Sequence, residues 1–72
     1  MKIALKATKK IKENLYNTIW IIGLEDLNEA RKIYNCMLDN NIVQEVELYI
    51  NNELTEVIQW NYTTNYITSH SL

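Results

Sequence analysis

Apolar and polar residues alternate over residues 2–11. Four apolar residues share one face, namely Ile3, Leu5, Ala7 and Ile11. The other face carries three basic residues, namely Lys2, Lys6 and Lys10. A period of two is typical of a half-buried β-strand, so this segment is predicted to be a strand with a solvated basic face. The pair Glu13-Asn14 follows and is the expected turn.

The segment from Tyr16 to Ile22 is apolar on both faces. It is rich in β-branched and aromatic residues, which favour strands. A strand that is apolar on both sides usually lies in the middle of a sheet or is covered by another element. We therefore expect this second strand, around Trp20, to be central or covered.

Spacings of three and four residues replace the period of two after Gly23. The apolar residues at these spacings are Leu27, Ala30, Ile33, Tyr34, Met37 and Leu38. They form one stripe along a helix. Asp26 is placed to cap this helix, Glu29 can complete a capping box, and Asn40-Asn41 can adopt the left-handed conformation that ends a helix. These signals predict a helix over residues 26–39.

The period of two returns at residue 43 and predicts a hairpin around Asn51-Asn52. The alternating apolar residues are Val46, Leu48, Ile50, Leu54, Ile58 and Trp60. A two-residue turn would set Glu47 opposite Glu56, and directly opposed like charges cost stability. A longer loop, or a bulge, pairs Ile50 with Leu54 and keeps the apolar residues on one face. Register usually follows the buried pattern, so the longer loop or bulge is favoured.

These elements predict an α+β fold with the order ββαββ. Four strands form a mainly antiparallel sheet, and one helix packs on one of its faces. Residues 1–68 form a single domain, and residues 69–72 are expected to be a disordered tail. The pattern leaves open whether Asn61 to Tyr66 extends the last strand as an aromatic row.

Residue counts exclude several kinds of site. The chain has 72 residues, with one Cys, one His and one Gly. These counts exclude an internal disulfide framework, a Cys/His zinc site and a Gly-rich phosphate loop. The one His, His70, lies near the chain end and is not expected to be catalytic, and Cys36 is expected to be a buried thiol beside the helix stripe. We therefore expect no enzyme activity, no metal and no cofactor.

Apolar runs are too short for a membrane span, which needs roughly 18 apolar residues. The longest run is the one from Ile19 to Ile22, which suits a strand. The amino terminus has only Ile3-Ala4-Leu5 behind its first lysine, too little for a signal-peptide core. A cytoplasmic protein with no membrane partner is expected.

The lysine face of the first strand permits binding of a nucleic acid or a nucleotide. Lys2, Lys6 and Lys10 could follow a phosphate backbone, and nearby aromatic residues could stack on bases. The formal net charge of −2 and the single Arg argue against this, because nucleic-acid-binding domains are usually basic. We retain it as an alternative function.

Acidic and aromatic residues gather in the carboxyl-terminal half. We expect a binding surface for a protein partner made of Glu45, Glu47, Glu53, Glu56, Trp60 and Tyr62. Since one helix covers one sheet face, some Trp and Tyr residues should stay exposed, as in many protein interfaces. Acidic groups would select a basic partner surface. A homodimer that hides the second face or pairs the uncharged carboxyl-terminal strand is a further alternative.

The whole chain resembles the small accessory proteins of bacteriophages and other mobile elements, including anti-CRISPR and other anti-defence proteins. The resemblance rests on its length, its Lys-, Asn-, Ile- and Tyr-rich composition, and the ββαββ plan with an acidic hairpin. No functional residue is carried over from it. It implies stoichiometric binding and inhibition of a host protein, such as a defence protein, or sequestration of a small nucleotide.

Overall fold

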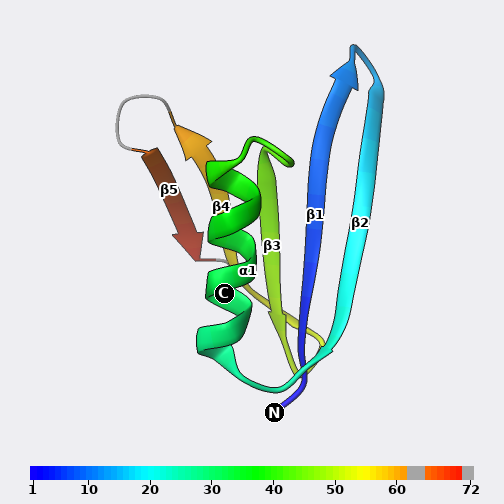
Figure 1. Cartoon of the computed structure of the whole chain (residues 1–72). Helices are drawn as coiled ribbons and strands as arrows, with labels where there is room; N and C mark the ends of the chain where they lie inside the picture. Colours follow the sequence, from blue (N-terminus) through cyan, green and yellow to red (C-terminus); the bar gives the residue numbers. More distant parts are fainter. Residues whose placement is uncertain (62–64, 71–72) are drawn as a thin grey trace.

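Five strands and one helix make up the described part of the chain (Figure 1). The structure is a computed structural model that describes residues 1–61 and 65–70, with side chains described for residues 1–59. The elements are β1 (Ile3–Lys12), β2 (Leu15–Leu24), α1 (Leu27–Asp39), β3 (Glu45–Ile50), β4 (Glu53–Asn61) and β5 (Asn65–His70). The predicted α+β class and the order ββαββ of the first five elements are confirmed.

The strands form one antiparallel sheet in the order β2-β1-β3-β4-β5. The predicted four strands are present, and β5 pairs with β4 as a fifth. β4 ends at Asn61, and Tyr66 pairs with Trp60 from β5 rather than extending β4. β5 includes residues 69 and 70, the first half of the expected tail, while residues 71 and 72 lie outside the described residues.

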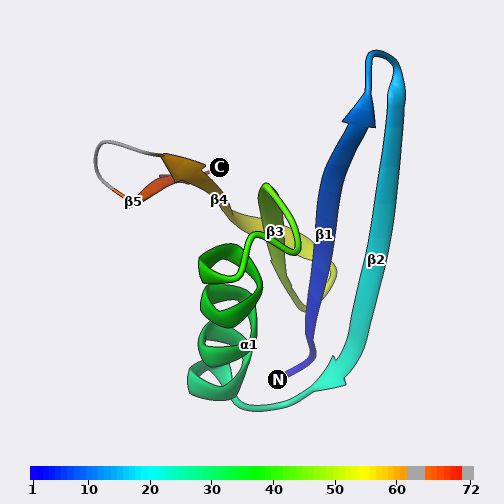
Figure 2. The same ribbon diagram turned by 45° about the horizontal axis from the view of Figure 1, so that its top comes forward.

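β2 is an edge strand, so the prediction that it is central or covered is wrong. β1 takes the inner position because it pairs with β2 on one side and with β3 on the other. The hairpin of β1 and β2 also extends past the end of α1 (Figures 1 and 2). The single helix therefore does not cover the Leu15 end of β2, where Leu15, Asn17 and Ile19 on the helix side of the sheet are exposed.

The ends of α1 follow from the residues that flank it. Asp26 is the N-cap as predicted, but its Oδ1 accepts from the backbone N–H of Asn28, at 2.9 Å, rather than from Glu29. Beyond the carboxyl end, Asn41 has a φ of 59°, in the left-handed region. The backbone N–H of Ile42 donates to the carbonyl oxygen of Met37 at 2.9 Å, which turns the chain back toward β3.

The core lies between α1 and one face of the sheet. Its buried apolar residues are Ile3, Leu5, Ala7, Ala30, Tyr34, Met37, Leu38, Val43, Val46, Leu48 and Ile58. The predicted helix stripe and the apolar face of β1 are thus confirmed, except that Ile11 is 48% exposed in the part of β1 beyond the helix. Cys36 is exposed, so the expected buried thiol is wrong. The Cys36 side chain points away from the apolar stripe of the helix.

The β3–β4 hairpin combines a two-residue turn with a bulge. Asn51 and Asn52 have φ of 52° and 68°, and Ile50 pairs with Glu53. The expected pairing of Ile50 with Leu54 is therefore wrong, because two successive asparagines tolerate positive φ and form the tight turn. The favoured bulge is confirmed. The register shifts between Leu48 and Tyr49, so that Glu47 lies opposite Val57 rather than Glu56.

Within the described residues, α1 lacks the length and apolar character needed to cross a membrane.

Candidate functional site

Among the described residues no helix lies over the sheet face opposite α1, and we call this face the open face. It comprises Ala4, Lys6, Thr8, Lys10, Tyr16, Thr18, Trp20, Ile22, Glu45, Glu47, Tyr49, Leu54, Val57 and Gln59. The register sets these residues in rows across the strands. The middle row joins Trp20, Lys6 and Glu47, which neighbour one another on β2, β1 and β3.

A contact network occupies the middle of the open face. Lys6 Nζ lies 3.7 Å from Glu47 Oε1 and 5.8 Å from the centre of the Trp20 ring. The Tyr49 hydroxyl donates to Glu47 Oε1 at 3.1 Å. One lysine is thus held by a carboxylate and by an aromatic ring, and the same carboxylate holds Tyr49.

The two aromatic rings of this network meet across an intervening strand. The centroids of Trp20 and Tyr49 are 5.6 Å apart, with their planes at 39°, although β1 lies between their strands. The partner of Tyr49 on β1 is Ala4, whose methyl group leaves room above the strand. The aromatic pair is therefore possible because β1 carries a small residue at this position.

The network also raises the pKa of Tyr49 above the ordinary value of 10.0. Desolvation contributes most, followed by the hydrogen bond to Glu47 and the charge of that carboxylate. Each of these effects disfavours the tyrosinate form, so Tyr49 stays a neutral hydrogen-bond donor at neutral pH.

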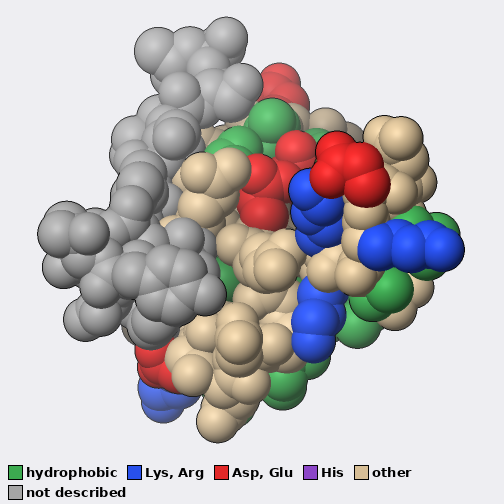
Figure 3. Space-filling view, turned by 90° about the horizontal axis from the view of Figure 1, so that it is seen from above, with side chains coloured by type: hydrophobic (Ala, Val, Ile, Leu, Met, Phe, Trp, Pro, Cys, Tyr) green, Lys and Arg blue, Asp and Glu red, His purple; other side chains and the backbone are tan. Residues whose placement is uncertain are grey.

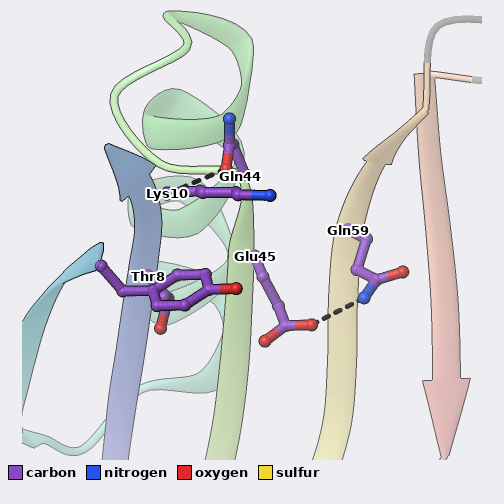
Figure 4. Close-up of a pocket in the computed structure, with 6 residues that line it drawn as sticks. Thr8, Lys10, Gln44, Glu45 and Gln59 are labelled. Carbon is purple, nitrogen blue, oxygen red and sulfur yellow. Dashed lines mark hydrogen bonds between the residues drawn. The ribbon is translucent and has the colours of Figure 1, made fainter. Parts of the chain in front are cut away.

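A polar hollow of about 310 Å³ lies at one end of the open face (Figure 4). It is lined by Thr8, Lys10, Tyr16, Gln44, Glu45 and Gln59. Gln59 Nε2 donates to Glu45 Oε1 at 2.6 Å, and Gln44 Oε1 accepts from the backbone N–H of Lys10 at 3.0 Å. Three of the lining side chains, those of Gln44, Glu45 and Gln59, thus already have hydrogen-bond partners, and these contacts pair no nucleophile with a base.

A second, more apolar hollow of about 410 Å³ lies at the other end. Its lining includes Met1, Ala4, Ile22 and Tyr49. Ile22 lies in a β-bulge, because two residues of β2 oppose Ala4 and Gly23 has a φ of 81°. The bulge leaves the Ile22 side chain 75% exposed.

The structure separates the four acidic residues of the expected binding surface. Glu45 and Glu47 lie on the open face, half-buried, and Glu53 is exposed beside the turn. The prediction that Glu56 belongs to this binding surface is wrong. Glu56 is 8% exposed and lies on the helix side of the sheet, where Arg31 Nη2 donates to its Oε1 at 3.2 Å. The bulge places Glu56 opposite Leu48, on the buried face, so it cannot act with Glu45 and Glu47.

The partners of Glu47 also determine what reversal of its charge would do. A substitution by Lys would set two ammonium groups side by side and remove the acceptor of Tyr49. Reversal at Glu47 is therefore expected to lower stability, whereas the exposed Glu53 is free of such side-chain contacts among the described residues. The side chains of Trp60, Tyr62 and His70 lie outside the described residues.

The lysines of the alternative nucleic-acid surface are partly neutralised within the chain. Lys6 pairs with Glu47, and Lys10 Nζ lies 3.1 Å from Glu13 Oε2. Lys2 is exposed. Seen from above, acidic and basic side chains lie next to one another on the molecule (Figure 3).

Three exposed residues of β2 were not among the expected site residues. Tyr16, Trp20 and Ile22 are 56%, 53% and 75% exposed on the open face. The signal that could have identified them is the absence of charge from the whole of β2. That absence suits a buried strand and a binding edge equally well, so the sequence pattern alone could not distinguish them.

Among the described residues, no group of three or more His, Cys, Asp or Glu side chains could hold a metal ion. Comparison with family models, with curated proteins and with solved structures gives no match to this chain. Its function is therefore inferred from its own geometry.

Proposed function

We propose that the chain is a non-enzymatic module that binds a protein partner on its open face, with Trp20 as the central anchor. The observation that carries this proposal is that Trp20 is 53% exposed while Tyr49 and Lys6 hold its ring. A large aromatic side chain that is already ordered loses little conformational entropy on binding. Trp and Tyr are the residues most enriched among energetically dominant interface positions.

The surroundings of Trp20 support a protein rather than a small-molecule partner. Tyr16 and Ile22 extend its apolar surface along β2, and Glu45 and Glu47 border it on β3. An apolar centre with charged groups at its edge is the usual make-up of a protein interface. The two hollows of the open face lie at its ends, beside this centre. Inhibition of a host protein, implied by the resemblance to anti-defence proteins, stays a prediction.

The test compares three immobilised proteins in a quantitative pull-down from a bacterial lysate. These are the wild type, Trp20→Ala and a matched control, Ile42→Ala. Ile42 is 48% exposed in the loop after α1, so its substitution removes a similarly exposed apolar side chain elsewhere. A true partner is retained by the wild type and by Ile42→Ala but is lost with Trp20→Ala.

The purified partner is then titrated against the same variants by calorimetry. Trp20→Ala should weaken binding by about tenfold or more. Glu53→Lys measures whether the exposed acid of the hairpin contributes. A partner whose affinity is the same for Trp20→Ala and wild type would contradict the proposal.

A further inference from the structure

We infer that β2 is the pairing edge for a second copy of this chain, so that two sheets join into one across a twofold axis. In the described part of the sheet, β2 pairs with β1 along one edge. Its other edge is a ten-residue row of backbone donors and acceptors. Such an edge can accept an added strand.

Apart from the bulge at Ile22 and Gly23, β2 lacks the features by which proteins protect edge strands. Free edges usually carry a lysine, a proline or an inward-pointing charge, or they are very short. β2 has ten residues, none of them charged and none of them proline. It is also among the longest strands of the sheet. A long edge strand with no charge and no proline favours an edge that is covered in the working protein.

Apolar side chains of β2 are exposed on both faces of the sheet, which favours an added strand as their cover. On the open face Trp20 and Ile22 are exposed, and on the other face Leu15 and Ile19 are 44% and 46% exposed. A neighbouring strand would contact side chains of both faces, because each strand of a sheet places residues alternately above and below it. The exposed apolar area is thus placed where a strand, rather than a globular surface, would cover it.

The charges at the two ends of β2 identify a second copy as the occupant. At the end next to Leu15, the hairpin carries Lys9, Lys10 and Lys12 against a single acid, Glu13, which pairs with Lys10; the described residues provide no ion pair for Lys9 or Lys12. At the other end, Glu25 and Asp26 directly follow Leu24 and outnumber the one lysine beside them, Lys2, which precedes Ile3, the partner of Leu24. One end is therefore basic and the other acidic.

Antiparallel pairing of two identical strands places the basic end of each copy beside the acidic end of the other. A twofold axis at Thr18, near the middle of β2, brings Lys12 of each copy toward Glu25 of the second copy. Between these ends no charged residue of β2 opposes another. A parallel arrangement would instead set like charges together, which is unfavourable. The strand is thus complementary to itself in one orientation.

An added strand lies beside the sheet and leaves the open face uncovered. The twofold axis brings the Trp20 residues of the two copies onto one continuous face. Dimer formation therefore goes beyond the proposed partner binding and does not depend on it. The isolated protein suffices for its test, so failure of one proposal can be told from failure of the other.

The test uses two opposite charges at one position near the axis, Thr18. Thr18 is exposed on the open face, within the middle of β2. In Thr18→Lys and in Thr18→Glu, two like charges face each other across the pairing strands. Sedimentation equilibrium should give twice the chain mass of 8.6 kDa for the wild type, and each variant should raise the dissociation constant about tenfold or more.

An equimolar mixture of Thr18→Lys and Thr18→Glu should restore the dimer, because opposite charges then face each other. Asn28→Lys and Asn28→Glu, on exposed Asn28 of α1, are the matched controls and should dimerise like the wild type. Circular dichroism checks that each variant is folded.

Three results would overturn the inference. A wild type at monomer mass even at millimolar concentration excludes the dimer and leaves a segment of another protein as the occupant of the edge. A dimer that neither Thr18 variant weakens uses another surface. Weakened variants that do not associate with each other on mixing exclude antiparallel pairing of β2 with itself.

Discussion

Glu56 Oε1 accepts a hydrogen bond from Arg31 Nη2 at 3.2 Å, and this contact joins β4 to α1 on the buried side of the sheet. The two side chains differ in exposure, because 45% of the Arg31 side chain but only 11% of the Glu56 side chain is accessible. Glu56 also helps to raise the pKa of the neighbouring Tyr34, although desolvation of the hydroxyl contributes more. The pair is therefore partly buried and asymmetric.

This asymmetry predicts that the two partners are not equivalent in substitution. Arg31→Ala leaves a buried carboxylate without its cation and should lower the free energy of unfolding by about 2 kcal/mol. Glu56→Met replaces the acid by an apolar side chain of similar size and leaves an arginine that can turn to solvent, so it should change stability by less than about 1 kcal/mol. Urea unfolding at neutral pH measures both, and an equal loss for the two variants would contradict the prediction.

The Trp20–Tyr49 pair predicts a measurable coupling. A double-mutant cycle with Trp20→Ala and Tyr49→Ala should give an interaction free energy of about 0.5–1.5 kcal/mol, because the rings touch across β1. Ala4→Leu should reduce this coupling, since a larger side chain would occupy the space between the rings. A cycle with Trp20→Ala and Ile42→Ala, whose side chains lie in different parts of the molecule, is the control and should be additive.

Asn51 and Asn52 both have positive φ but should respond differently to glycine. Asn52→Gly should keep or raise the thermal midpoint, because glycine adopts positive φ without strain. Asn51→Gly removes the side-chain oxygen that accepts from the backbone N–H of Lys2 at 3.0 Å, so it should cost about 1 kcal/mol. Calorimetry of the two variants tests this order, and a less stable Asn52→Gly than Asn51→Gly would refute it.

The raised pKa of Tyr34 and of Tyr49 predicts a loss of stability at alkaline pH. The folded state holds these phenolic protons more tightly than the unfolded state, whose tyrosines titrate near 10.0. The stabilisation is therefore complete below that pH and is lost as the pH rises through the higher folded values. Urea midpoints between neutral and strongly alkaline pH measure this decline.

Replacing either tyrosine separates its contribution to that decline. Tyr34→Phe removes one titrating group, so stability should fall less steeply with alkaline pH than in the wild type. Tyr49→Phe should act in the same direction. If both variants keep the wild-type dependence on pH, the tyrosines are not its cause.

Alternation along β1 and the helical spacing in α1 predicted the core correctly because each is a local property of the sequence. Ile3, Leu5 and Ala7 are buried as expected, and so are Tyr34 and Leu38 of the helix. These residues need only a partner surface on one side, whichever strand provides it. The fold class followed from such local patterns.

The open face depends on neighbours that no local pattern specifies. Trp20 is exposed because β1, rather than β2, pairs on both sides. Glu56 is buried because a one-residue bulge near Thr55 moves it to the helix side, and a shift of one residue exchanges the two faces of a strand. The partners of Glu47 come from β1 and from its own strand, so its role requires the register of both.

The inner position of β1 has a consequence for the order of folding. β1 and β2 are adjacent along the chain, but β1 meets β3 only through pairs such as Ile3 with Ile50, which are far apart in sequence. Closing this long loop costs conformational entropy before the contacts between β1 and β3 can compensate for it. In a nascent chain that does not yet include β3, the β1–β2 hairpin therefore lacks the strand that completes its buried face. β1 is therefore made before β2 and β3 but gains its second neighbour only when β3 pairs with it.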